Sequence, residues 1–126
     1  MMRRAHPTES QEQAAIFAWA ARAKGRYPEL ALLHAIPNGG DRHPAVGARM
    51  KREGVKRGVP DICLPVPRGE YHGLYIELKA HGGRVSDDQK AWHLMLEAQG
   101  YWVSICWGFD SARERIENYL NEKWEE

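Results

Sequence analysis

Glu77 and Lys79 stand two positions apart in a run, Leu74 to Lys79, in which apolar and polar residues alternate strictly. Residues two apart on a strand point to the same side, so this carboxylate and this ammonium can share one ligand. Taken alone, the pair has a plain alternative, an exposed Glu–Lys pair on an edge strand, which contributes little to stability. The pair therefore needs a third residue before it indicates chemistry.

Asp61 is that third residue. Pro60-Asp61 opens the preceding apolar run, and the segment between the two runs is short enough for a hairpin. Antiparallel pairing would bring Asp61 beside Glu77, and two carboxylates that close repel each other unless a cation lies between them. Mg²⁺ takes oxygen ligands from one or two carboxylates and keeps several waters. Lys79 is then left for a phosphate oxygen or an attacking water, so the trio predicts metal-assisted phosphate chemistry.

The elements that must hold this trio follow from capping and periodicity. The sequence predicts a helix from the Thr8-Gln11 capping box to Gly25, a buried strand over 30–36, a basic helix over 45–52, strands over 61–66 and 74–79, a helix from the Ser86-Gln89 capping box to Gly100, a strand over 101–107 and a helix capped by Asp110. The order α-β-α-β-β-α-β-α predicts an α/β fold, a mixed sheet flanked by helices. The 126 residues suit one domain, with a core over about 8–108 and a C-terminal helix over about 110–122.

Charge is balanced overall, at a net +1, but basic residues gather just before Pro60-Asp61. They are Arg42, Arg49, Lys51, Arg52, Lys56 and Arg57. A basic stretch that enters the site is placed to bind a polyanion such as a nucleic-acid backbone, although charge alone fits a solvated helix face equally well. Asn38, in a Pro-Asn-Gly-Gly turn, is a further candidate for a phosphate contact, or a plain turn residue.

Other residues indicate location and packing. Cys63 and Cys106 lie in apolar runs and read as buried thiols of a reducing compartment. No apolar stretch could span a bilayer, and the N-terminus lacks the apolar region of a secretion signal, so we expect a cytoplasmic protein and no membrane partner. Five histidines show no zinc spacing and are expected on the surface or in packing: His34, His43, His72, His81 and His93. Trp19, Trp92, Trp102 and Trp107 are expected in the core rather than as base-stacking platforms.

The motifs together resemble a known family. Pro60-Asp61 followed by Glu77-Leu78-Lys79 is similar to the PD-(D/E)XK nuclease signature. The longer strings resemble the VRR-NUC family over about residues 8–108: Ile36-Pro37-Asn38-Gly39-Gly40, the run GVKRGVPD ending at Asp61, and Ser86-Asp87-Asp88-Gln89 with Trp92 and Gly100. The bare D…ExK pattern is common by chance, whereas GVKRGVPD with ExK and SxxQ in order is far more specific.

The resemblance implies a restriction-endonuclease-like core and a set of roles. Asp61, Glu77 and the backbone carbonyl of Leu78 would bind Mg²⁺ or Mn²⁺, and Lys79 would position or help deprotonate the nucleophilic water. Gln89 would line the site; its alternative is the capping box with Ser86, and one side chain is not expected to serve both. Glu9 would be a ligand on the side of a second metal ion, and Glu12 is the alternative residue for that role. A carboxylate favoured in a helix's first turn is the other explanation for Glu9.

The same resemblance implies an activity. Stand-alone members of the family act on branched or structured DNA, such as four-way junctions or flaps, often as homodimers. We therefore expect a homodimeric, metal-dependent DNA endonuclease in a bacterial or phage-infected cell. One alternative is an inactive or accessory DNA-binding subunit of a repair or packaging complex. Another is a restriction-type enzyme that cuts duplex DNA at a sequence, for which the chain offers no obvious base-reading element.

Overall fold

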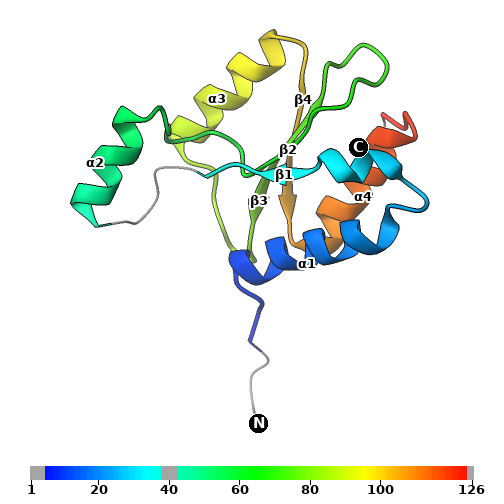
Figure 1. The fold of residues 1–126 in the computed structure, drawn as a ribbon, viewed down its shortest axis with the longest axis horizontal. Coiled ribbons are helices and arrows are strands. Elements are labelled where there is room, and N and C mark those ends of the chain that lie inside the picture. Colours follow the sequence, from blue (N-terminus) through cyan, green and yellow to red (C-terminus); the bar gives the residue numbers. More distant parts are fainter. Residues whose placement is uncertain (1–4, 38–42, 125–126) are drawn as a thin grey trace.

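The computed structural model describes residues 5–37 and 43–124, in one α/β layer sandwich (Figure 1). The elements are α1 (Glu9–Ala23), the 3₁₀ helix η1 (Pro28–Leu32), β1 (His34–Ala35), α2 (Pro44–Arg52), β2 (Ile62–Leu64), β3 (Leu74–Lys79), α3 (Asp87–Ala98), β4 (Trp102–Trp107) and α4 (Phe109–Leu120). None of the described helices is long and apolar enough to cross a membrane. The predicted fold class and the order of helices and strands are confirmed.

The sheet is mixed, in the strand order β1-β2-β3-β4. β2 pairs antiparallel with both β1 and β3, whereas β3 and β4 run parallel because α3 connects them. The prediction of a strand over 30–36 is mostly wrong. The 3₁₀ helix η1 occupies the first half of this segment, and only His34–Ala35 pairs with β2. Pro28 explains the difference, since proline is favoured in the first turn of a helix.

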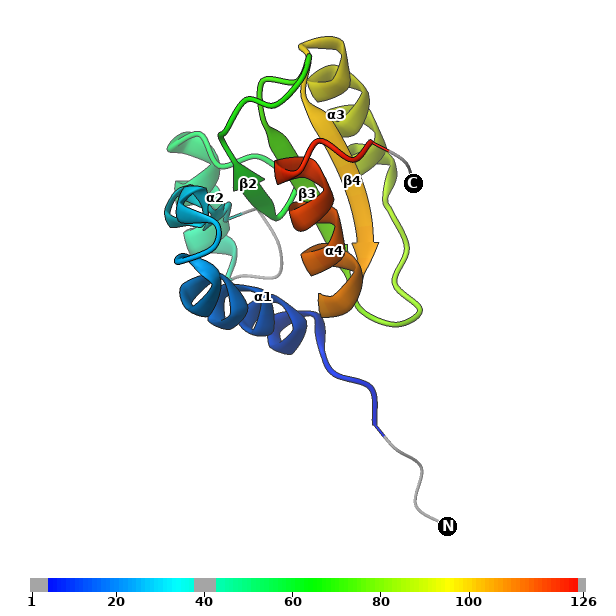
Figure 2. The same cartoon turned by 90° about the vertical axis from the view of Figure 1, so that its right-hand side faces the viewer.

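The two faces of β3 meet different helices. Leu74, Ile76 and Leu78 belong to the buried core, which α1 and α4 cover with side chains such as Ile16 and Ile116. The polar face, which carries Glu77 and Lys79, lies under α3, as the contacts of α3 residues with both side chains establish. Figure 2 shows α3 and α4 on opposite sides of β4. β3 is therefore covered on both faces, which buries its charged residues.

Of the tryptophans expected in the core, Trp102 is confirmed there. Its ring packs against Trp124, with centroids 5.0 Å apart, and against Tyr119, whose hydroxyl donates to the Val66 carbonyl at 2.7 Å. Trp19 is partly buried against this core, Trp92 is partly buried outside it, and Trp107, at the end of the edge strand β4, is half exposed (50%). The expectation that Cys63 and Cys106 are buried free thiols is confirmed.

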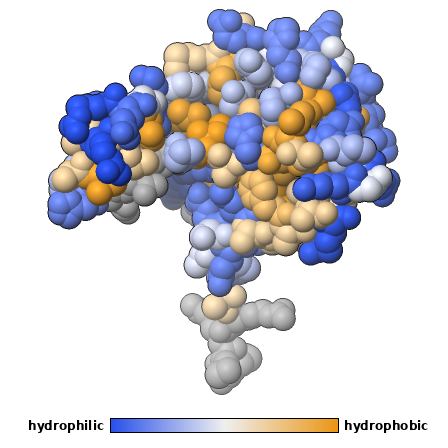
Figure 3. All heavy atoms as spheres, viewed as in Figure 1, coloured by the Kyte–Doolittle hydropathy of each residue, from blue (hydrophilic) through white to orange (hydrophobic). Residues whose placement is uncertain are grey.

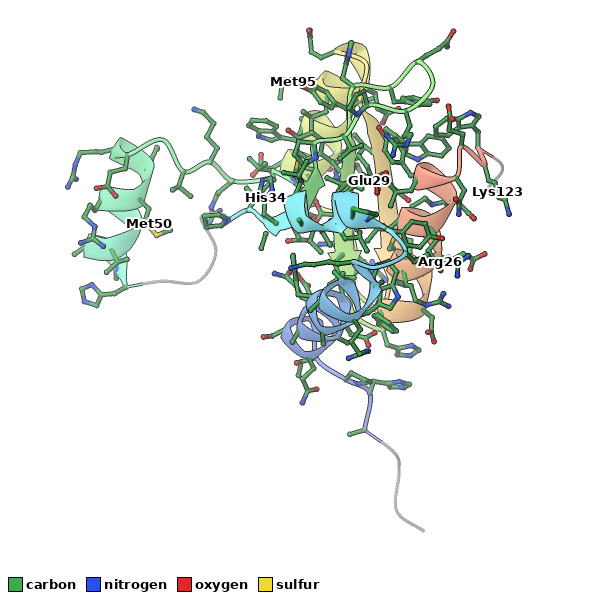
Figure 4. All side chains as sticks on the ribbon, turned by 45° about the vertical axis from the view of Figure 1, so that its right-hand side comes forward. Arg26, Glu29, His34, Met50, Met95 and Lys123 are labelled. Atoms are coloured by element: carbon green, nitrogen blue, oxygen red, sulfur yellow. The ribbon has the colours of Figure 1, made fainter. Side chains whose placement is uncertain are left out.

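The α2 helix projects from the body of the molecule (Figures 1 and 3). It has no buried residue, and its exposed surface is mostly hydrophilic. Met50, on the same helix, also lies far from the sheet in Figure 4. A helix without buried residues gains little from packing, so its position depends on the segments that join it to the body.

Gly58 fixes one of those segments, just before Pro60-Asp61. Its backbone has φ +91°, and a Cβ there would stand 2.6 Å from the Asp88 carbonyl oxygen and 2.9 Å from Cδ1 of Trp92. We expect Gly58→Ala to lower the free energy of unfolding by about 1–3 kcal/mol, because both the φ angle and the close approach to α3 oppose a side chain.

Gly47→Ala is the matched control, since it lies in α2 with open space around the added Cβ. Alanine in a helix interior should leave stability unchanged or raise it by about 0.5–1 kcal/mol. Chemical denaturation of both variants measures the difference. Equal stability of the two would show that the segment tolerates a side chain at Gly58.

Candidate active site

The three residues singled out by chemistry come together at the carboxyl end of β3. The register Ile62↔Ile76 between β2 and β3 places Asp61 beside Glu77. All three side chains are buried: Asp61 is 7% exposed, Glu77 0% and Lys79 8%. Burial of three ionisable groups in contact is costly and is typical of functional sites.

The Gln89 amide joins the trio to α3. Its Oε1 accepts hydrogen bonds from Lys79 Nζ at 2.9 Å and from the Ser86 backbone N–H at 2.8 Å. Its Nε2 donates to Glu77 Oε2 at 3.2 Å. Gln89 therefore caps α3 and lines the site at once, and the expectation that it could do only one is wrong. The amide oxygen has two lone pairs and the nitrogen two hydrogens, which suffices for both.

His93 is the residue that sequence reasoning missed. It was expected in a surface or packing role, but it is 6% exposed and its Nε2 lies 3.2 Å from Glu77 Oε1. Burial, followed by the charge of Lys79, lowers the pKa of His93. The available signal was its spacing: His93 is four residues after Gln89, so both lie on one face of α3.

Glu77 is the most strongly perturbed carboxyl. Burial raises its pKa to about 9, helped by its hydrogen bond with Asp61 and by the Asp61 charge, while Lys79 opposes the shift. Near neutral pH, Glu77 therefore holds a proton beside Asp61. When a divalent cation binds a carboxylate pair that shares a proton, it displaces that proton and both carboxylates become ionised.

The two candidate acids of α1 face different partners. The pKa of Glu9 is raised by burial and by Asp61 and lowered by Lys79, so its carboxylate lies in the field of the trio. Glu12 Oε2 instead accepts the Phe109 backbone N–H at 3.2 Å. Glu12 thus caps α4, and of the two only Glu9 is placed toward the site.

The cap of α4 departs from expectation for the same reason. Asp110 was predicted to cap this helix, but the N-cap position is Gly108, with φ +90°, and Asp110 lies in the first turn. Gly108 has no side chain that could accept a backbone N–H of α4, and Glu12 of α1 supplies that acceptor. Such a contact between elements far apart in the chain leaves no local pattern in the sequence.

The backbone of Leu78 faces Asp61. Its N–H donates to Asp61 Oδ2 at 2.7 Å, and in a β-strand the N–H and C=O of one residue point to the same neighbour. Continued by two residues, the Ile62↔Ile76 register places Pro60 opposite Leu78. Proline has no N–H to give, so Pro60 leaves the Leu78 carbonyl without its ladder donor.

Comparison with known proteins agrees with this geometry. The family model of the VRR-NUC domain matches residues 7–110. The chain belongs to the VRR-NUC domain family. A solved structure described as a VRR_NUC domain protein is 33% identical, with a TM-score of 0.79, and the match covers 93% of this chain and 91% of that one. No curated protein matches the chain. The family is one of nuclease-type domains, so a nuclease role and DNA as partner follow for this chain.

The oxygen donors of this VRR-NUC domain suit a hard cation. Asp61 and Glu77 offer carboxylates, Leu78 offers a carbonyl, and Glu9 lies nearby. Among the described residues, no three His, Cys, Asp or Glu side chains form a ready-made metal cage. Mg²⁺ does not require one, because it binds through one or two carboxylates and keeps several waters. The donor set therefore fits Mg²⁺ or Mn²⁺ rather than zinc.

The basic residues of the VRR-NUC domain are placed differently from the acids. Arg49, Lys51 and Arg52 are exposed on the projecting α2, where Arg49 pairs with Glu53 at 3.9 Å. Lys56 and Arg57 are exposed in the segment that runs from α2 to Pro60. Asn38 and Arg42 lie outside the described residues.

Proposed function

We propose that this VRR-NUC domain is a Mg²⁺- or Mn²⁺-dependent DNA endonuclease that acts on branched DNA such as four-way junctions or flaps. The observation that carries the proposal is the buried cluster of Asp61, Glu77 and Lys79, in which Glu77 has a pKa of about 9. A protein stabilised only by packing gains nothing from burying such a cluster, whereas a cation-binding hydrolase needs it.

The contacts support a role for each residue of the site. Asp61, Glu77 and the Leu78 carbonyl would hold the metal ion, and Glu9 would serve a second ion. The bound metal would polarise the scissile phosphate and lower the pKa of a water molecule. Lys79, held by Gln89 at 2.9 Å, would place its ammonium near that water or near a phosphate oxygen. His93 holds the Glu77 carboxyl from the side of α3.

Branched DNA is supported by the projecting basic helix. Arg49, Lys51 and Arg52 stand away from the acidic site, where they can bind the backbone of a second duplex arm while the first lies at the site. A homodimer would provide two such sites related by a two-fold axis, which suits the symmetry of a four-way junction. We place this activity in the cytoplasm of a bacterial or phage-infected cell.

A panel of labelled substrates tests the proposal. Purified protein is incubated with junction, flap, single-stranded and linear duplex DNA, with Mg²⁺ or Mn²⁺, beside a Lys79→Ala variant. We expect cleavage of the branched substrates only, dependent on metal and lost in the variant. Absence of cleavage on all four would indicate an accessory DNA-binding subunit, and equal cleavage by Lys79→Ala would place the catalytic site elsewhere.

His93→Ala provides a prediction for the residue that sequence analysis missed. Residues that hydrogen-bond to a metal ligand without touching the metal typically contribute 10- to 100-fold to metal affinity or activity. We expect His93→Ala to raise the metal concentration needed for half-maximal cleavage by about tenfold, with a smaller effect at saturating metal.

His72→Ala is the control, because His72 is exposed near the other end of β3. Its metal dependence should match that of the wild type. If His93→Ala lowered cleavage equally at all metal concentrations, the histidine would act on the reaction itself and not through Glu77.

A further inference from the structure

Trp107 ends β4 beside the candidate catalytic lysine. The parallel register pairs it with Lys79, and neighbouring strands lie about 4.8 Å apart. Its indole Nε1 donates to the Gly83 carbonyl at 2.9 Å, which fixes the ring in place while half of its surface stays exposed. A fixed, exposed aromatic ring next to a nuclease site is a surface on which a base can stack.

The ring is one wall of a depression of about 360 Å³, which we call the Trp107 pocket. Its other lining residues include His6, Glu12, His81 and Gly82. The rings of His6 and His81 stack on each other, with centroids 3.8 Å apart and 14° between their planes. The volume lies in the range of small-ligand sites, and flat rings line it, so its shape suits a planar ligand.

Glu12 determines which part of a nucleotide the pocket accepts. Its Oε2 accepts the Phe109 N–H, and its Oε1 takes no hydrogen bond from any residue in the described part of the chain. A carboxylate repels phosphate but accepts hydrogen bonds from the amino group of a base, as in contacts with cytosine. The pocket is therefore suited to the base and not to the backbone.

We propose that the Trp107 pocket binds one unpaired nucleobase, stacked on Trp107, next to the phosphate that lies at Lys79. A strand whose phosphate meets Lys79 brings its neighbouring base over the adjacent strand β4. Any unpaired base can donate to Glu12, through the exocyclic amino group of adenine, cytosine or guanine or through the N3–H of thymine. The inference rests on the proposed nuclease function, and it explains a preference for branched DNA, since unpaired bases occur at branch points and flaps.

Two substitutions separate stacking from the indole hydrogen bond. Trp107→Phe and Trp107→Leu both lose the N–H donated to Gly83, but only leucine loses the aromatic ring. The probe is a fluorescent duplex with a single-stranded flap, which carries either an adenine or an abasic residue at the branch. Its binding is measured by anisotropy without divalent metal.

Wild type should bind the adenine flap about tenfold more tightly than the abasic flap, within the range known for base–aromatic stacking. Trp107→Phe should retain most of this preference and Trp107→Leu should lose it. Leu32→Ala, which removes an exposed side chain from η1, should behave as wild type. Equal binding of both flaps by wild type, or an unchanged preference in Trp107→Leu, would overturn the proposal.

A second measurement does not depend on the variants. With 2-aminopurine at the branch position, stacking on Trp107 should quench its fluorescence when wild-type protein is added, and absence of quenching would overturn the proposal. Both measurements follow binding without metal. A protein that discriminates flaps but does not cut would contradict only the nuclease function, and one that cuts without discrimination would contradict only the base pocket.

Discussion

Exchange of Glu77 for glutamine is expected to slow metal-dependent cleavage by about 10³-fold and also to stabilise the metal-free protein in alkaline solution. Glutamine keeps the size of the side chain and can keep contacts with Gln89 and His93, but it cannot supply an anionic ligand. Loss of the metal's contribution, several kcal/mol, corresponds to a decrease of about 10³-fold in rate.

The effect on stability follows from the raised pKa. The pKa of Glu77 rises from 4.5 to about 9 in the fold, so the folded protein favours the neutral carboxyl. The stability that Glu77 contributes is fully present below the ordinary pKa of glutamate. It is lost as the pH rises toward the pKa of Glu77 in the folded protein. Glutamine is neutral throughout. The melting temperature of Glu77→Gln should therefore exceed that of metal-free wild type increasingly between about pH 5 and about pH 9.

Thermal unfolding in chelator across this pH range measures the difference. Glu97→Gln is the control, because Glu97 is exposed on α3, and it should follow the wild-type curve. A Glu77→Gln variant that melts below wild type at alkaline pH would mean that Glu77 is ionised in the fold and paired with a cationic group.

Lys79→Met is expected to lower the cleavage rate by about 10²- to 10³-fold while metal still binds. Methionine keeps the apolar part of the side chain, against which Gly83 packs closely, so the fold should persist. The ammonium lies 3.9 Å from Glu77 Oε2 and opposes the rise of the Glu77 pKa. Removal of the ammonium should weaken metal binding modestly near neutral pH. It should also slow the reaction, because a positive charge is lost near the phosphate.

Single-turnover cleavage at saturating metal separates these two effects. Lys90→Met, an exposed lysine on the same helix as Gln89, should cut as wild type does. If saturating metal restored full activity to Lys79→Met, Lys79 would serve only to tune Glu77 and would have no role at the phosphate.

The centre of the site was predictable because it depends on local pattern and one pairing. The alternation in Leu74–Lys79 placed Glu77 and Lys79 on one face, and a short connection implied the hairpin that brings in Asp61. These features depend on the period of a strand and on chain length between strands, both of which are visible in the sequence.

The parts that were missed depend on contacts between distant elements. His93 reaches Glu77 because α3 packs across the polar face of β3, and a lone histidine in a helix does not reveal that. Glu12 caps α4 across 97 residues, and Trp107 is exposed only because β4 is an edge strand. The strand expected over 30–36 failed because the same apolar residues also suit a 3₁₀ turn that begins at Pro28.

Metal binding tests the central claim most directly. Mn²⁺ is titrated calorimetrically into wild type and into Asp61→Asn near neutral pH, in buffers of different ionisation enthalpy. Because Glu77 holds a proton up to a pKa of about 9, the account predicts saturable binding with release of a proton, and loss of both in Asp61→Asn. Binding without proton release, or equal binding by Asp61→Asn, would contradict a metal site at Asp61 and Glu77.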